Sequence, residues 1–232
     1  MALHPYDEII GLTGGPVSYE LEPWGHIKLR EYAFPASIQK LEFDIIRTIV
    51  KSYNLKRGYE CATAFGVSSV AAGLAFKETG GKLVTMDAYV EELFNNCNDY
   101  RGKKPVTYAD SDNYKSAKFL HNHFGLNDTV FAEVGWSPRD TASVISKHFG
   151  PEEKLDFVFI DAGHFPEQVI QDIDSFVPFL AEKNVLMFHD VYDSVFDATV
   201  KNRVRELFGK DIEIIVPNET GRGDNLGILI NM

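Results

Sequence analysis

From residue 58 onward, short apolar runs alternate with longer stretches in which apolar residues recur three or four positions apart. The short runs are rich in β-branched and aromatic residues, as strands are, and the longer stretches have the period of amphipathic helices. We expect strands in five segments, GYECAT, KLVTMD, TVFAEVG, LDFVFIDAG and NVLMFHD. We expect helices over residues 67–78, about 112–124, 138–149, 165–181 and 194–208. Such units in series predict an α/β protein with a doubly wound parallel sheet.

The end of the chain breaks this rhythm. The runs DIEIIVP and NLGILIN are separated only by NETGRGD, a turn-rich loop that is too short for a crossover helix. The two runs are therefore expected to pair as an antiparallel hairpin. Added to the parallel strands, they predict a mostly parallel, seven-stranded sheet with an antiparallel C-terminal hairpin.

The N-terminal segment has a different pattern. Residues 1–36 contain several prolines and glycines and no clear periodicity, so we expect an irregular arm that covers a site or docks on another subunit. Residues 37–232 are expected to form a single domain. That domain should open with a helix in SIQKLEFDIIRTIVKSYNL, for which Ser37 is the expected N-cap. The polar segment 88–111 is the second candidate for a lid.

Composition narrows the functional classes. The chain has 232 residues, 44% of them hydrophobic, which suits one sizeable core. Its 23 Lys and Arg against 34 Asp and Glu give a formal charge of -11, which argues against nucleic acid as a partner. Only Cys61 and Cys97 are present, and we expect free thiols in a reducing compartment. With no membrane-spanning or signal-like segment apparent, we expect a soluble, cytoplasmic protein that does not bind a membrane. A homodimer is possible through the apolar hairpin edge and the aromatic arm.

The turn after the first of these strands is the most informative motif. In YECATAFGVSSV, small residues stand at every second position, at Ala62, Ala64 and Gly66. This spacing differs from the G-x-G-x-x-G of dinucleotide-binding turns. It resembles the first motif of class I S-adenosylmethionine-dependent methyltransferases, roughly Glu/Asp-x-Gly-x-Gly-x-Gly. The most similar members by eye are the small O-methyltransferases of the catechol and caffeoyl-CoA type and their antibiotic-pathway relatives.

This resemblance implies a Rossmann-like fold and S-adenosylmethionine as cofactor. The residues of the motif that it implies for cofactor binding are Glu60, Ala62, Ala64, Phe65, Gly66 and Ser68. Alanine replaces the family's glycine at positions 62 and 64. A left-handed backbone there would cost about 1–2 kcal/mol for each alanine. A turn of small residues that holds no ligand is the alternative.

Two further segments fit the same cofactor. Asp87 ends the second strand, at a spacing from the turn that suits a carboxylate accepting both hydroxyls of a ribose. By the resemblance, the loop with Gly135, Trp136 and Ser137 borders the adenine. Trp136 could stack on that ring, and a core tryptophan is the alternative.

A second group of polar residues follows the next two strands. The fourth strand ends FIDAGHFPE and the fifth ends LMFHDVYDS, so Asp161, His164, His189 and Asp190 should meet at one edge of the sheet. Two oxygen ligands and an imidazole can hold a divalent cation. By the resemblance, the metal ligands are Asp161, His189 and Asp190, for Mg²⁺ or another divalent cation, and Asp161 also borders the cofactor. A histidine at 189 makes the site softer than a Mg²⁺ cage.

A metal-free alternative uses the other histidine. His164 could take the substrate proton directly, with Asp161 or Asp190 orienting its ring. The candidate catalytic residues are therefore His164, Asp161 and His189. Histidines that only tie two loops together by hydrogen bonds are the structural alternative.

The remaining polar residues are assigned to structure. The five histidines away from strand ends are expected on the surface or in a lid, namely His4, His26, His121, His123 and His148. Glu167 and Asp172 are expected to interact with a helix dipole. The basic cluster RGKK at 101–104 is expected to be a solvated loop.

The function expected from these motifs is methyl transfer from S-adenosylmethionine to an oxygen of a small-molecule acceptor. Two alternatives stay open. One is a binding protein that kept the fold and lost or altered its cofactor, and the other is a metal-dependent hydrolase or hydroxylase that uses the His and Asp cluster.

Overall fold

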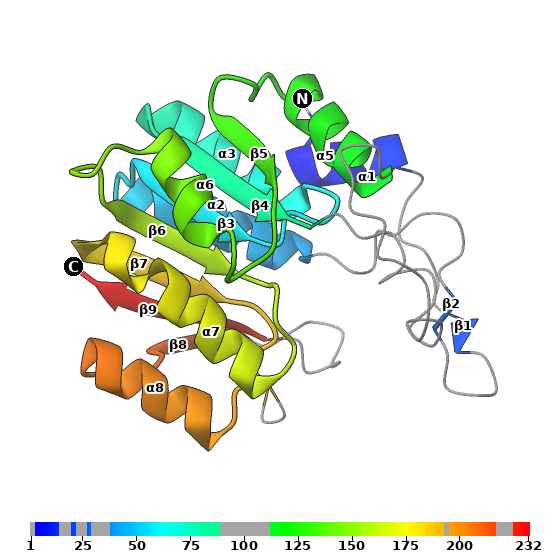
Figure 1. The fold of residues 1–232 in the computed structure, drawn as a ribbon. Coiled ribbons are helices and arrows are strands. Elements are labelled where there is room, and N and C mark those ends of the chain that lie inside the picture. The colour runs from blue at the N-terminus through cyan, green and yellow to red at the C-terminus, as the bar shows by residue number, and fades with distance from the viewer. Residues whose placement is uncertain are drawn as a thin grey trace.

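The expected alternation of strands and helices is present in the computed structural model, which describes residues 3–13, 20–21, 27–28, 38–88, 112–192, 195–216 and 225–232. A seven-stranded sheet has the order β5-β4-β3-β6-β7-β9-β8 (Figure 1). Its strands are β3 (Arg57–Cys61), β4 (Lys82–Asp87), β5 (Val130–Val134), β6 (Leu155–Ile160), β7 (Leu180–Phe188), β8 (Ile214–Val216) and β9 (Leu226–Asn231). The short strands β1 (Glu20–Leu21) and β2 (Ile27–Lys28) pair antiparallel with each other.

The directions of the strands confirm the expected fold class. The neighbours from β5 to β7 are all parallel, whereas β9 is antiparallel to both β7 and β8. The C-terminal hairpin therefore closes a mostly parallel sheet. The chain progresses outward from β3 in one direction and then returns to its other side at β6, which creates a switch point between β3 and β6 at the carboxyl ends of the strands.

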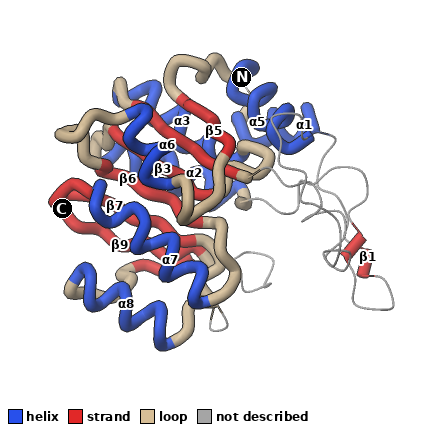
Figure 2. The backbone as a smooth tube through the Cα atoms, in the orientation of Figure 1, coloured by secondary structure: helices blue, strands red, loops and turns tan. Residues whose placement is uncertain are grey.

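Helices cover both faces of this sheet, as Figures 1 and 2 show. The helices are α1 (Pro5–Thr13), α2 (Lys40–Ser52), α3 (Val67–Thr79), α5 (Asp112–His123), α6 (Thr141–His148), α7 (Pro166–Phe176) and α8 (Ala198–Phe208). Side chains of α1, α2, α3 and α5 share one buried cluster with the sheet, and those of α6, α7 and α8 share the other. The arrangement is doubly wound because each face of the sheet needs its own apolar cover.

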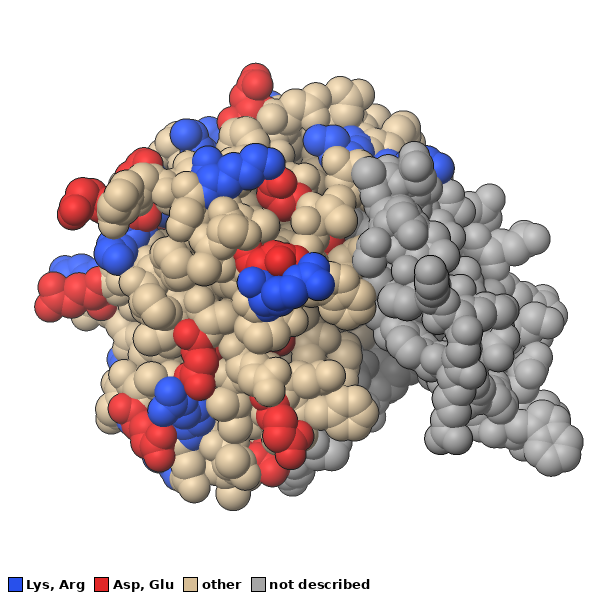
Figure 3. All heavy atoms as spheres, viewed as in Figure 1, with Lys and Arg blue, Asp and Glu red and all other residues tan. Residues whose placement is uncertain are grey.

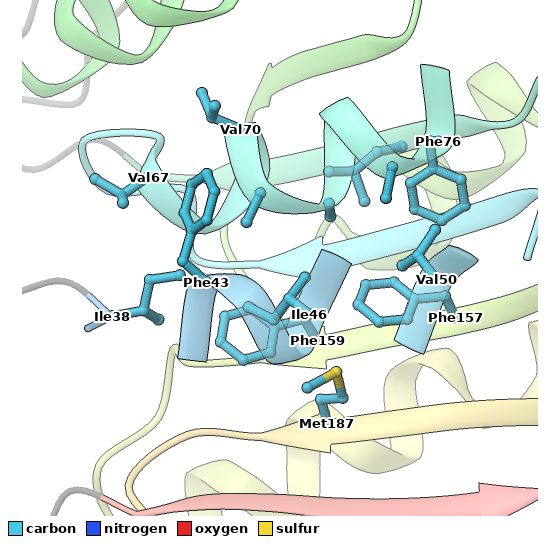
Figure 4. Close-up of a cluster of buried hydrophobic side chains, with 14 of the residues drawn as sticks. Ile38, Phe43, Ile46, Val50, Val67, Val70, Phe76, Phe157, Phe159 and Met187 are labelled. Atoms are coloured by element: carbon cyan, nitrogen blue, oxygen red, sulfur yellow. The ribbon is translucent and has the colours of Figure 1, made fainter. Parts of the chain in front are cut away.

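Figure 4 shows the first of these clusters. Side chains from α2 and α3 meet those of β6 and β7 there, among them Phe43, Ile46, Val70, Phe76, Phe157, Phe159 and Met187. The strands of the parallel sheet are buried on both faces, so β6 is an unbroken apolar run apart from Asp156 at its start. This packing fixes where β6 ends and the site begins.

Two expectations about the elements were wrong. Residues 5–13 form helix α1 in place of an irregular arm, and Ile9 is fully buried in the first cluster. The helix expected over 165–181 ends at Phe176, a 3₁₀ turn covers Val177–Phe179, and β7 begins at Leu180. Proline at 178 cannot donate the next helical hydrogen bond, which explains this early end. Several expectations lie outside the described residues, namely those for Ser37, for Cys97 and for the polar segment after Ala88. Of the N-terminal arm after α1, only β1 and β2 are described.

The N-cap of helix α2 lies two residues after the expected Ser37. Gln39 is the N-cap, and its backbone N–H donates to Glu42 Oε2 at 2.6 Å in a capping box. This contact places Glu42 near the carboxyl ends of the strands.

Within the described ranges, no helix is both long and apolar enough to cross a bilayer. On the face shown in Figure 3, acidic side chains and basic side chains alternate over the described surface, and neither kind forms one large patch.

Candidate active site at the carboxyl ends of the strands

The turn between β3 and α3 is built on left-handed backbone conformations. The φ angle is +82° at Ala62, +43° at Ala64 and +90° at Gly66. The Ala62 N–H donates to the Met86 carbonyl at 2.9 Å, and the Gly66 N–H donates to the Thr63 carbonyl at 2.8 Å. Both alanines therefore occupy conformations that favour glycine, as the methyltransferase motif has, at about 1–2 kcal/mol each. The surrounding hydrogen bonds hold the turn despite this cost.

Asp87 joins this turn to the end of β4. Its Oδ2 accepts a hydrogen bond of 2.8 Å from the Ala64 N–H, and its backbone carbonyl accepts one of 2.9 Å from Gly135. A Cβ on Gly135 would lie 2.8 Å from Met86 Sδ, so only glycine allows this close approach. The loops after β3, β4 and β5 are thus linked through one residue.

Glu60 lies beneath the turn. Its side chain is buried and accepts a hydrogen bond from the Thr85 hydroxyl, which lies 2.6 Å from the Thr63 hydroxyl. Burial raises the pKa of Glu60 to about 7, against hydrogen bonds from Ser68 and Thr85 that lower it. Glu60 and Ser68 are therefore placed to support the turn from inside, and their contact with a cofactor stays a prediction.

Helix α5 packs directly on the turn. A Cβ on Gly66 would lie 2.8 Å from the Cα of Ala117, so the two backbones meet without room for a side chain. His121 is fully buried, and its Nε2 lies 2.6 Å from Ser69 Oγ. Ser69 Oγ also donates to the Gly66 carbonyl at 3.0 Å, so one serine connects His121 on α5 to the turn. Burial, with a smaller effect of Lys118, lowers the pKa of His121 to about 3.

The expectation that His121 lies on the surface or in a lid was wrong. Leu120 directly precedes it, Ala117 lies four positions before it and Phe124 three positions after it, and all three side chains are buried or partly buried. That spacing was readable as a helical face. The other described histidines outside the strand ends pair with carboxylates, His4 with Asp44, His123 with Glu8 and His148 with Glu133. His26 and the 101–104 cluster lie outside the described residues.

The loop after β5 is hydrogen-bonded to Asp172, which we had expected to interact with the helix dipole. Ser137 Oγ donates to Asp172 Oδ1, and Asp172 is only 3% exposed. Asp172 is thus a buried acceptor in the middle of α7 and not a residue of the first helical turn, so the assignment to the helix dipole was wrong. Trp136 is half-buried, which does not fit the alternative of a core tryptophan. Its backbone N–H donates to Asp140 at 2.8 Å.

Polar side chains from β6, β7 and α2 converge at the switch point. His189 Nδ1 lies 3.2 Å from Asp161 Oδ1 and 3.2 Å from Asp190 Oδ1, and its Nε2 lies 3.3 Å from Glu42 Oε1. Burial alone would lower the pKa of His189, but the Asp161 charge and hydrogen bonds to the acids raise it well above its usual range. His189 is therefore an imidazolium that neutralises part of a group of three carboxylates. Asp190 has a left-handed backbone, with φ of +58°.

His164 occupies the outer side of this group. Its Nδ1 lies 2.9 Å from Asp190 Oδ2, and 56% of its side chain is exposed, against 10% for His189. The hydrogen bond that His164 donates to Asp190 raises the pKa of His164. The strand-end prediction thus brought Asp161, His164, His189 and Asp190 together correctly, but it missed Glu42. Glu42 belongs to a distant helix, and its only signal was the capping box.

The geometry also changes the expected set of metal ligands. One atom from each of Asp161, His164 and Asp190 lies within 4.8 Å of the others, a spacing that could hold a cation. Both ring nitrogens of His189 face carboxylates, so this geometry favours His164 over the predicted His189 as the imidazole ligand. Two carboxylates and an imidazole fit a borderline cation such as Mn²⁺, Fe²⁺ or Zn²⁺ better than Mg²⁺.

Comparisons with known proteins identify the family. A family model described as a methyltransferase domain matches residues 59–191, more than half of the chain. The match covers the turn after β3, Asp87, the loop after β5 and the four residues Asp161, His164, His189 and Asp190, whereas Glu42 lies outside it. The chain therefore belongs to this methyltransferase family, and it has the class I S-adenosylmethionine-dependent methyltransferase fold.

Solved structures share this fold at low sequence identity. An O-methyltransferase from Bacillus cereus in complex with SAH is 13% identical, with a TM-score of 0.63 over 99% of this chain and 92% of that chain. The O-methyltransferase TomG from Streptomyces achromogenes, involved in tomaymycin synthesis and in complex with SAM, is 15% identical, with a TM-score of 0.60 over 85% and 82%. The SAH-bound methyltransferase PaMTH1 from Podospora anserina is 11% identical, with a TM-score of 0.60 over 100% and 89%.

Proposed function

We propose that this protein transfers the methyl group of S-adenosylmethionine to an oxygen of a small molecule. The observation that carries the proposal is the junction at Asp87, which ties the left-handed turn to the loop after β5. This junction brings together the carboxyl ends of three strands, the edge at which a nucleoside cofactor binds in sheets of this kind. The similar structures named above, two bound to SAH and one to SAM, support the same cofactor.

The reaction needs alignment more than covalent help from the protein. The acceptor oxygen attacks the methyl carbon in line with the sulfonium, an O–C bond forms, and the C–S bond breaks to leave S-adenosylhomocysteine. The acceptor hydroxyl loses its proton in this step. A general base beside the methyl group would therefore assist an acceptor whose hydroxyl is neutral.

His164 is the proposed base. Asp190 holds its Nδ1, so Nε2 is the ring nitrogen without a carboxylate partner in the described part of the chain. Its exposure lets a substrate reach it. His189 lies against Asp161 and Asp190 through Nδ1 and against Glu42 through Nε2, and a positive charge on His189 limits repulsion among the three acids.

A divalent cation is compatible with the same cluster. Asp161, His164 and Asp190 would hold it, and a bound cation would lower the pKa of an acceptor hydroxyl and orient it. Metal analysis of the purified protein, before and after Asp190→Ala, tests this part. Metal that stays bound after the substitution would exclude the cluster as its site.

Calorimetry with S-adenosylhomocysteine tests the cofactor. We expect micromolar binding to the unmodified protein and a loss of about tenfold or more in Asp87→Asn, because a neutral amide accepts more weakly from the turn and from ribose hydroxyls. Asp128→Asn is the matched control, since Asp128 is exposed in the turn before β5. If the unmodified protein takes up no S-adenosylhomocysteine or S-adenosylmethionine, the alternative of a binding protein with a lost or altered cofactor is favoured.

Transfer of a labelled methyl group to a panel of small hydroxyl compounds tests the base. His164→Ala should lower kcat by about 10²–10⁴-fold, the usual contribution of general base catalysis, and leave the affinity for S-adenosylhomocysteine unchanged. His123→Ala, a partly exposed histidine on α5, should behave like the unmodified protein. Equal activity of His164→Ala and the control would contradict the assignment of His164.

A further inference from the structure

The candidate site is built from loops whose strands are not all neighbours. In the order β5-β4-β3-β6, two strands separate the one that precedes Ser137 from the one that precedes Gly163. These two strands therefore share no hydrogen bonds of the sheet, and their loops are linked through it only by way of β4 and β3. A contact outside the sheet would link the two sides of the site directly.

Asp172 on α7 lies next to both loops and is hydrogen-bonded to the first of them. Oδ1 accepts the hydrogen bond from Ser137, in the loop after β5. Oδ2 lies 3.1 Å from the position that a Cβ on Gly163 would take, in the loop after β6. Oδ2 is buried and has no hydrogen-bond partner among the described residues, and the nearby Gly163 backbone N–H lowers the pKa of Asp172. Gly163 stands between Asp161 and His164, so the second oxygen touches the loop that carries the reactive cluster.

The same carboxylate influences the turn after β3. Cys61, the last residue of β3, is buried, and burial together with the charge of Asp172 raises the pKa of its thiol. Thr141 Oγ1 lies 3.3 Å from both Ser137 Oγ and the Tyr59 hydroxyl. Asp172 is thus the charged member of a buried polar chain that reaches into the sheet. Burying a carboxylate is costly, and burial raises the pKa of Asp172 to about 6.

We propose that Asp172 is a positioning residue that couples the adenosine side of the site to the loop of Asp161 and His164. This inference rests on the proposed function only for the identity of the ligand. The position of Asp172 between Ser137 and Gly163 does not depend on which ligand binds. The proposal assigns a role in the site to a buried residue of helix α7, which would act through Ser137 and Gly163.

Two substitutions break the link at different ends. Ser137→Ala removes the donor on the β5 side and leaves the carboxylate in place. Asp172→Asn keeps an acceptor for Ser137, but it then turns an NH₂ group toward the Gly163 N–H, where two donors repel. Asp174→Asn is the matched control, because Asp174 is on the same helix and forms an exposed ion pair of 2.8 Å with Arg203.

Hydrogen exchange of residues 161–165, followed by mass spectrometry with and without S-adenosylhomocysteine, tests the coupling. Without ligand, Ser137→Ala and Asp172→Asn should speed exchange in this segment by about threefold to tenfold, the effect of one hydrogen bond, and the control should not. With ligand, exchange there should slow in the unmodified protein and slow less in both variants. Ligand affinity should fall in Ser137→Ala and stay near the unmodified value in Asp172→Asn, a difference that general destabilisation would not produce.

Two outcomes separate this proposal from the proposed function. Unchanged exchange of residues 161–165 in ligand-free Ser137→Ala would overturn the coupling, whatever the cofactor is. Absence of S-adenosylhomocysteine binding to the unmodified protein would overturn the cofactor assignment, while the ligand-free comparison would still decide the coupling. If Asp172→Asn does not fold, Ser137→Ala alone carries the ligand-free test.

Discussion

Single residues in the site combine an unfavourable state with a compensating partner. Glu60 and Asp172 are buried acids beside hydroxyl donors, and His189, with 10% of its side chain exposed, lies among three acidic side chains. Ala62, Ala64 and Asp190 hold left-handed backbones. Such states persist only where the surroundings determine them, and they concentrate at functional sites.

The pH dependence of stability should reveal the buried state of Glu60. Its pKa is about 7 in the folded protein against an ordinary value of 4.5, so between these values the folded protein keeps a proton that the unfolded chain has lost. The free energy of unfolding therefore falls as the pH rises through this window, by about 3 kcal/mol at roughly 1.4 kcal/mol for each pKa unit. Glu60→Gln should lack this fall.

Urea unfolding of both proteins at the two ends of the window measures the effect. Groups common to both, including Asp172, cancel in the difference between the two curves. Glu78→Gln is the control, because Glu78 is partly exposed beside Lys51. Parallel curves for Glu60→Gln and the unmodified protein would show that Glu60 titrates alike in the folded and unfolded states.

At this scale, sequence reasoning found residues that follow a strand and missed those that face inward from a helix. Asp161, His164, His189 and Asp190 share a sheet edge because parallel strands end together. Glu42, His121 and Asp172 reach the site or its supports from α2, α5 and α7. Their roles depend on how each helix is rotated against the sheet, and a strand-end rule contains no such information.

Among the elements, helix α3 follows the turn and has a left-handed glycine at each of its ends. Gly66 caps its start and Gly80 caps its end, with φ of +90° and +73°. Only Gly66 lies against another element, since a Cβ there would meet α5, whereas nothing lies within 4 Å of such an atom on Gly80. The two glycines therefore separate the effect of conformation from that of docking.

Substitution by alanine at each end should differ in size. Gly80→Ala should lower the free energy of unfolding by about 1–2 kcal/mol, the cost of a left-handed alanine. Gly66→Ala should lower the free energy of unfolding by about 1–3 kcal/mol more than Gly80→Ala, because of the clash with Ala117. It should also abolish cofactor binding. Chemical denaturation and calorimetry measure the two effects, and equal losses of stability would argue against close packing of α5 on the turn.

Element boundaries were predictable where a pattern had one meaning. The strands from β3 to β6 and the hairpin follow from apolar runs between turn residues. The start of β7 was misplaced because apolar residues from Val177 to Leu180 suit a helix or a strand, and Pro178 decides between them. Helix α1 was missed because its nine residues are fewer than periodicity needs, and its stability comes from packing of Ile9.

For the molecule as a whole, the last strand completes both cores. Ile228 belongs to the cluster under α2 and α3, and Leu229 belongs to the cluster under α7 and α8. The hairpin is therefore part of the domain's interior and not an appended edge. Strand order could be narrowed from the sequence by the rules for crossovers, but the place of β9 between β7 and β8 required the structure.

Leu229→Ala should lower the free energy of unfolding by about 2–5 kcal/mol, because it leaves a cavity in a fully buried position. Ile215→Ala, in the same hairpin and 55% exposed, should cost less than about 1 kcal/mol. Thermal and urea unfolding measure both changes. Similar losses would mean that β8 is covered in solution, as the predicted homodimer through this edge would require.

The alanines of the turn after β3 also change the state from which the protein folds. A chain with alanine at 62 and 64 samples fewer backbone conformations when unfolded than one with glycine there, so less entropy is lost when the turn orders. The same restriction applies before a ligand arrives. A turn that is already rigid loses little conformational entropy when a ligand binds. We therefore expect the turn to keep its shape on binding and not to close around the ligand.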